Sequence, residues 1–187
     1  PTVLRLDVSF WENNLADRLP ITLGDGGRVS SLTLDVGRLM EPEPPLFAPD
    51  FIDGSTMEQG ISLLGYDLPT KAAKGETVPI TLYWQADDPI SADYTVFMHL
   101  IDQSGSIVSQ DDGPPAEGDW PTSAWQPGHS LVDHHDLVLP EELPSGKYLF
   151  AIGLYDPYSG ARMSAFTSKG ELWRDGAIRP SSVLVIP

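Results

Sequence analysis

Cysteine is absent from the 187 residues, and its absence limits the chemistry that the chain can perform. Without thiols the protein forms no disulfide, has no thiolate nucleophile and offers no thiolate ligand to a metal. Basic residues are few, since 11 lysines and arginines stand against 27 acidic residues and give a formal net charge of −16. This charge repels phosphate backbones, so we expect no nucleic-acid partner. It serves solubility, or it attracts cations or a cationic partner.

Long apolar runs are also missing. None approaches the roughly 20 residues of a membrane-spanning helix, so we expect no direct membrane insertion by this segment. The sequence begins at Pro1 without an initiator methionine or an apolar signal core, and we expect it to belong to a longer precursor. With 41% hydrophobic and 20% charged residues, the composition is that of a globular protein.

Short alternating segments are what the chain does contain, punctuated by 18 prolines and 17 glycines. Over residues 77–85 the apolar positions alternate with other residues, which predicts a half-buried strand with Trp84 in the core. Gly-containing turns predict two hairpins, around residues 24–27 and 103–105. Tyr148 follows a Pro-Ser-Gly turn and has the position of a corner tyrosine, whose hydroxyl bonds a nearby carbonyl. Further strands are predicted over residues 3–10, 29–36, 61–68, 93–102, 147–156 and 183–186.

These segments predict an all-β fold, an immunoglobulin-like or jelly-roll antiparallel β-sandwich of about eight to ten short strands. We expect residues 1–187 to form a single domain, with N-terminal strands in residues 1–40 packed on a main sandwich of residues 60–187. Residues 41–59 are expected to be a connecting strap, because the prolines between residues 41 and 50 oppose both a helix and a strand ladder.

Residues 63–163 also carry a family resemblance. The runs LLGY at 63–66, TLYW at 81–84, YTVFMHL at 94–100, DGPP at 112–115, PTSAW at 121–125 and GLYD at 153–156 are its motifs. This region resembles a β-sandwich found in uncharacterised bacterial envelope proteins, often as the C-terminal extracytoplasmic part of multi-pass membrane glycosyltransferases that use lipid-linked sugars. The resemblance implies an extracytoplasmic location and no catalytic residue, because the chemistry of such enzymes is assigned to their membrane portion.

Potential metal ligands are clustered in residues 129–136: His129, Asp133, His134, His135 and Asp136. Imidazole and carboxylate are common zinc ligands, but strand alternation places Asp133 and His135 on one face and their neighbours on the other. A metal site would therefore need a bulge or a ligand from another strand, such as His99. The alternatives are a solvated strand end, or a catalytic site of a metal-dependent hydrolase.

An acidic, glycine-containing loop is the second candidate site, with Asp111, Asp112, Glu117 and Asp119 as its carboxylates. Calcium takes six to eight oxygen ligands, and such a loop can offer them, although the spacing matches no EF-hand. The alternative is an ordinary acidic loop. We expect no cofactor other than calcium.

Aromatic residues in loops form the third candidate site, which comprises Trp120, Trp125 and Tyr158. Exposed rings there could stack on sugar faces, since loops are where a sandwich displays binding groups. The alternative is that the tryptophans fold back and cover one end of the sandwich.

No catalytic residues are predicted, because the sequence has no nucleophile elbow, phosphate loop or dinucleotide fingerprint. The sequence therefore favours a non-catalytic accessory or interaction module of a bacterial envelope protein, with a membrane glycosyltransferase as one candidate parent. Carbohydrate or another domain of that parent is the expected partner. A carbohydrate-binding module that uses the loop aromatics is the first alternative, and a metal-dependent hydrolase is the second.

Overall fold

The computed structural model describes residues 48–128 and 130–187 and, before them, the backbone of strands β1 to β6. Its contacts divide the chain into two compact units, Pro1–Pro45 and Leu46–Pro187. The boundary falls within the proline-rich stretch that the sequence predicts to be a connection. The expected packing of residues 1–40 on the sandwich stays a prediction.

The strands of the N-terminal unit form antiparallel pairs. β1 pairs with β6, β2 with β3, and β4 with β5. Ile21 lies opposite Val29 in the last pair, which confirms the hairpin predicted at the glycine-rich turn between them. The strands are β1 (Thr2–Val8), β2 (Phe10–Trp11), β3 (Arg18–Leu19), β4 (Ile21–Thr22), β5 (Arg28–Val29) and β6 (Leu32–Leu39).

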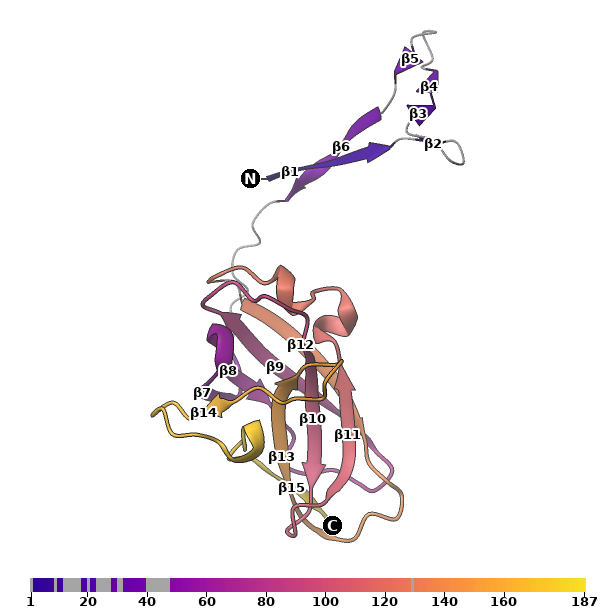
Figure 1. The fold of residues 1–187 in the computed structure, drawn as a ribbon. Coiled ribbons are helices and arrows are strands. Elements are labelled where there is room, and N and C mark those ends of the chain that lie inside the picture. The colour runs from indigo at the N-terminus through magenta and orange to yellow at the C-terminus, as the bar shows by residue number, and fades with distance from the viewer. Residues whose placement is uncertain are drawn as a thin grey trace. The chain divides into compact units, whose positions relative to one another are not determined.

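The second unit is an antiparallel β-sandwich, so the predicted all-β fold is confirmed (Figure 1). A four-stranded sheet has the order β11–β10–β13–β15, and a five-stranded sheet has the order β12–β9–β8–β7–β14. The strands are β7 (Phe51–Met57), β8 (Ile61–Asp67), β9 (Thr77–Ala86), β10 (Thr95–Ile101), β11 (Ile107–Gly113), β12 (Ser130–Val138), β13 (Gly146–Tyr155), β14 (Ala165–Phe166) and β15 (Val183–Ile186).

Helical structure in the described residues consists of short 3₁₀ turns: η1 (Glu58–Gly60), η2 (Pro115–Gly118), η3 (Thr122–Ala124) and η4 (Arg174–Gly176). None of these helices is long and apolar enough to cross a membrane.

The sandwich begins earlier than the sequence predicts. Residues 51–57, assigned to the connecting strap of residues 41–59, form strand β7 of the five-stranded sheet. The prolines end at Pro49, so a ladder is free to form after it. A register shift between Ile52 and Ser55, with Gly54 at a φ of 99°, breaks the period-two pattern and hides this strand from sequence analysis.

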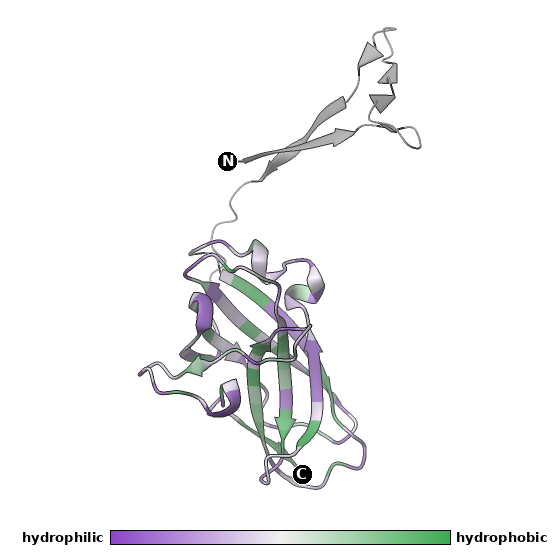
Figure 2. Cartoon of the chain, in the orientation of Figure 1, coloured by the Kyte–Doolittle hydropathy of each residue, from purple (hydrophilic) through white to green (hydrophobic). Residues whose placement is uncertain are grey.

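Buried and more exposed residues alternate along β9 and β12, which gives the five-stranded sheet a buried face. Figure 2 shows the hydropathy of the strands. Trp84 is fully buried in the main core between the sheets, as predicted. On β10, Val96 and Met98 point into that core, whereas Phe97 joins a smaller apolar cluster on the other face of the sheet. The corner tyrosine is confirmed as well, because the hydroxyl of Tyr148 donates to the carbonyl oxygen of Pro144 at 2.7 Å.

The edge strands of the two sheets, β11 and β12, meet at one side of the sandwich. The hydroxyl of Ser109 donates to the carbonyl oxygen of Val138 at 2.6 Å. The amide of Asp136 donates to a carboxylate oxygen of Asp111 at 3.3 Å. These side chains occupy edge groups that would otherwise be free to pair with another chain, and they close this side of the molecule.

Candidate functional site

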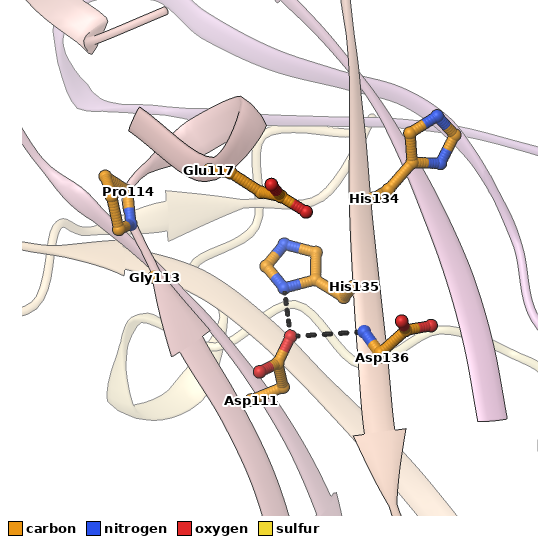
Figure 3. Close-up of a pocket in the computed structure, with 7 residues that line it drawn as sticks. All are labelled: Asp111, Gly113, Pro114, Glu117, His134, His135 and Asp136. Atoms are coloured by element: carbon orange, nitrogen blue, oxygen red, sulfur yellow. Dashed lines mark hydrogen bonds and ion pairs between the residues drawn. The ribbon is translucent and has the colours of Figure 1, made fainter. Parts of the chain in front are cut away.

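A cleft of about 240 Å³ opens between β11 and β12 (Figure 3). Its position follows from the fold, since this is where the two sheets present neighbouring edges. β11 is largely hydrophilic in Figure 2, unlike β10 beside it. The residues that line the cleft are Asp111, Gly113, Pro114, Glu117, His134, His135 and Asp136.

The polar run of β12 divides between two faces. Asp133 and His135 are buried and point into the sandwich, whereas His134 and Asp136 are exposed. This confirms the alternation predicted from the sequence, with no bulge to bring the two pairs together.

His135 lies between two carboxylates. Its Nδ1 is 2.9 Å from Oδ2 of Asp111 on β11, and its Nε2 is 3.0 Å from Oδ2 of Asp133 on its own strand. Asp133 is 1% exposed and accepts two further hydrogen bonds, from the amide of Ala116 at 2.8 Å and from Nε1 of Trp84 at 3.3 Å. The three side chains therefore join the two sheets through a hydrogen-bonded group in which Asp133 and His135 are buried and Asp111 is partly exposed.

The surroundings of His135 favour its protonated form. Burial by itself lowers the pKa of this imidazole, but the hydrogen bonds and negative charges of Asp133 and Asp111 outweigh burial and raise the pKa above 6.5. Since carboxylate oxygens only accept, both ring nitrogens donate, as in an imidazolium ion. Neither nitrogen is then free to take a proton from a substrate, so His135 is unsuited to act as a general base.

The groups that remain available for a ligand lie around the mouth of the cleft. Glu117 extends from η2 into the cleft in Figure 3, and its side chain is exposed. His134 has its Nδ1 3.2 Å from the hydroxyl of Thr81, which leaves Nε2 for a ligand. Asp136 is also exposed. Together these groups provide hydrogen-bond donors and acceptors around a small polar hollow.

The four carboxylates predicted to form a calcium loop do not converge. Asp111 faces His135 at the edge of the sandwich, whereas Asp112 lies on the opposite face of β11, with its Oδ1 3.1 Å from Nε2 of His99. The prediction treated these residues as a loop, but β11 continues to Gly113, and a strand sends neighbouring side chains to opposite faces. Glu117 and Asp119 follow in and after η2.

A histidine metal site is not assembled either. His99 pairs with Asp112 on the outer face of the four-stranded sheet, away from Asp133 and His135. His129 lies outside the described residues. Within residues 48–128 and 130–187, no group of three or more histidine and acidic side chains is placed to hold a metal ion.

The three loop aromatics have different environments. Trp125 is 4% exposed, belongs to the main core, and donates from Nε1 to the carbonyl oxygen of Trp120 at 3.0 Å. Its predicted role in stacking on sugars is therefore wrong, and the alternative of loop packing holds for it. Trp120 is 45% exposed and Tyr158 is 97% exposed. These two remain accessible, in separate loops.

The pairing of Asp111 with His135 was missed in the sequence. The two residues are separated by 24 positions and meet because edge strands of different sheets come together. Spacing along the chain gives no signal for such a contact, although each residue was noted separately as a potential ligand.

Comparison with known proteins supports the fold. No protein-family model matches the sequence, and no curated protein matches it. The chain is similar to the C-terminal domain of wzt, with a TM-score of 0.50 and 15% identity, covering 75% of this chain and 82% of that one. It is also similar to a CARDB domain from Pyrococcus furiosus solved in complex with di-metal ions, with a TM-score of 0.38 and 8% identity, covering 78% and 97%. At 15% identity the first likeness shows the β-sandwich alone.

Proposed function

We propose that the sandwich is a non-catalytic accessory module that binds a ligand on behalf of a longer bacterial envelope protein. The observation that carries this proposal is the state of His135, the buried imidazole of the cleft. Both of its nitrogens are bonded to carboxylates, and its pKa is raised. The cleft therefore presents hydrogen-bonding groups to a ligand, but His135 cannot act as a base because both of its nitrogens are bonded to carboxylates.

The envelope location rests on the sequence resemblance, which implies an extracytoplasmic position. A part in a longer protein is consistent with the similar domain of wzt, which is itself named as a C-terminal domain. No feature of the comparisons supports a glycosyltransferase parent, so the proposal is limited to an envelope protein.

A neutral carbohydrate is the ligand class that the cleft favours. Carboxylates such as Glu117 and Asp136 accept hydrogen bonds from hydroxyl groups, and Nε2 of His134 can add a further bond. Between Lys74 and Lys147 the sequence contains no lysine or arginine, so β9 to β12 lack fixed positive charges. The imidazolium of His135 is already paired with two carboxylates, so the carboxylates around the cleft would repel an anionic ligand.

The test is a titration of the full chain with neutral and acidic oligosaccharides, followed by ¹H–¹⁵N NMR. We expect saturable shifts at Gly113 and His134 with neutral sugars only. Glu117→Gln and Asp136→Asn should each weaken binding about tenfold, because a hydrogen bond to a charged group contributes about 1.5–3 kcal/mol. Asp112→Asn makes the same change of charge on the opposite face of β11, and it should leave binding unchanged.

Two results would count against this proposal. Binding that is lost equally in Asp112→Asn would place the ligand elsewhere. Release of sugar products in proportion to protein concentration, measured by chromatography after long incubation, would show that the module is an enzyme.

A further inference from the structure

Positive charge is concentrated in one part of the sandwich. After Lys147 the basic residues are Arg162, Lys169, Arg174 and Arg179, all within the segment that connects β13 to β15. In a chain of net charge −16, arginines would be expected to pair with the abundant carboxylates. Arg174 does so, with its Nε 3.5 Å from Oδ2 of Asp175. Arg162 and Arg179 form no such pair with the described carboxylates.

Arg179 is held beside the outer face of the four-stranded sheet. Ile178 pairs with Ile152 of β13 through backbone hydrogen bonds of 2.8 and 3.0 Å in both directions. Because side chains alternate along an extended chain, Arg179 next to the buried Ile178 lies on the outer face, in line with Ala151. Ala151 is in turn opposite His99 of β10.

Arg162 reaches the same face from the loop after β13. Its guanidinium carbon lies 4.2 Å from the ring centroid of Phe97, the position two residues before His99 on β10. This geometry is that of a cation–π contact, and it fixes the plane of the guanidinium. Phe97 and His99 share the outer face of the sheet, so Arg162 lies over the position next to the row formed by His99, Ala151 and Arg179.

Most of the hydrogen-bonding capacity of both arginines is unused. Nη1 of Arg162 donates to the carbonyl oxygen of Asp175 at 3.4 Å, and Nη1 of Arg179 donates to that of Ala177 at 3.3 Å. An arginine has five N–H donors. Of the carboxylates in the described part of the chain, none lies within ion-pair distance of either guanidinium.

The two charges act on each other and on the histidine beside them. Burial is the largest cause that lowers the pKa of Arg179, and the charge of Arg162 lowers it further, whereas the negative charge of Asp175 opposes the shift. The pKa of His99 is lowered first by burial and also by both arginines, although the adjacent Asp112 opposes this. Arg179 is partly buried and Arg162 is exposed, and an anion bound by both would relieve the repulsion between the two like charges.

We propose that Arg162 and Arg179 form a binding site for a single oxyanion, a carboxylate or a phosphoryl group, on the outer face of the four-stranded sheet. The planar guanidinium fork matches either group through paired N–H···O bonds. Phe97 and the carbonyl oxygens of Asp175 and Ala177 hold the two forks in place before the ligand arrives. This site is on a different face from the neutral-ligand cleft, and it does not depend on the function proposed for that cleft.

The test is an NMR titration of the arginine Nε–H signals in the full chain, at constant ionic strength, with inorganic phosphate, acetate and chloride. We expect phosphate or acetate to shift the signals of Arg162 and Arg179 saturably, and chloride to have no such effect. Saturation with phosphate would identify a phosphoryl ligand, and saturation with acetate would identify a carboxylate ligand. Arg162→Gln and Arg179→Gln should each weaken binding at least tenfold, and Arg162→Lys and Arg179→Lys, which keep the charge but lose the fork, by a smaller factor.

Arg174→Gln is the matched control, because it removes the same charge from an arginine that is paired with Asp175 and whose side chain is 93% exposed. It should leave binding unchanged. Equal responses to chloride, or an equal loss in Arg174→Gln, would mean general screening and would overturn the proposal. Absence of saturation in all three titrations would do the same. The lysine variants keep the test decisive if a glutamine variant fails to fold.

Discussion

Asp133 is the residue on which the closed side of the sandwich depends most. It is 1% exposed and accepts hydrogen bonds from His135, Trp84 and Ala116. Asp133→Asn keeps the shape but removes the more deeply buried of the two charges that balance the imidazolium. Because removing one partner of a buried ion pair is strongly destabilising, we expect the free energy of unfolding to fall by about 3 kcal/mol. Urea denaturation measures this change.

Asp136→Asn provides the comparison, since Asp136 is exposed on the same strand. Its free energy of unfolding should stay within about 0.5 kcal/mol of the parent value. Equal losses in the two variants would show that the buried carboxylate has no special role.

The pKa values of the two buried histidines should be shifted in opposite directions. The pKa of His135 is raised, so its contribution to stability is complete below pH 6.5 and is lost as the pH rises through its folded pKa. The pKa of His99 is lowered, so its contribution is present above pH 6.5 and is lost as the pH falls through its folded pKa. Imidazole ¹³Cε1 shifts followed by NMR should place the midpoint of His135 above 6.5 and that of His99 below it. Coincident midpoints would contradict the burial and pairing described above.

At the scale of elements, the contact of β13 with η4 depends on one glycine. A Cβ added at Gly153 would lie 2.5 Å from the ring of Phe97 and 2.7 Å from the carbonyl oxygen of Gly176. Because this oxygen belongs to the backbone, it cannot move away by rotation of a side chain. Gly153→Ala should therefore push the segment around η4 off the sheet and cost about 1–3 kcal/mol in the free energy of unfolding.

Gly113→Ala is the control for this prediction, because a Cβ at Gly113, also in a strand, meets nothing within 4 Å. Its free energy of unfolding should change by about 0.5 kcal/mol or less. Thermal melts of both variants, monitored by near-ultraviolet circular dichroism, give the comparison. A melting temperature lowered equally in both would attribute the loss to glycine replacement in general.

The sequence predicts the faces of single elements better than the meeting of elements. Alternation assigns Trp84 to the core and separates His135 from Asp136, because both features depend on the two-residue period of one strand. Applied to β11, the same two-residue period would have placed Asp111 and Asp112 on opposite faces of the strand. Contacts across sheets, such as Asp111 with His135, depend on strand order, and no local pattern encodes that order.

At the scale of the whole molecule, composition and turn residues suffice for the fold class but not for the boundaries. Strands bounded by clear turns, such as 61–68 and 183–186, are predicted within a residue. β7 is missed because its bulge disrupts the alternation, and its omission displaces the predicted start of the sandwich. The sequence does not predict a site at Arg162 and Arg179, because the two residues are far apart along the chain and only the fold places them on the same face without a carboxylate partner.

Residues 46–187 should form a domain that folds without the N-terminal unit. Among the described residues, the buried main core extends from Met57 to Ile186, within the second compact unit. A fragment of residues 46–187 should therefore fold by itself and unfold in one cooperative transition, since a domain with its own core does not need the rest of the chain. Circular dichroism melts of the fragment and the full chain test this expectation. A fragment without a cooperative transition would contradict it, whereas a cooperative fragment that melts well below the full chain would show that residues 1–45 contribute to its stability.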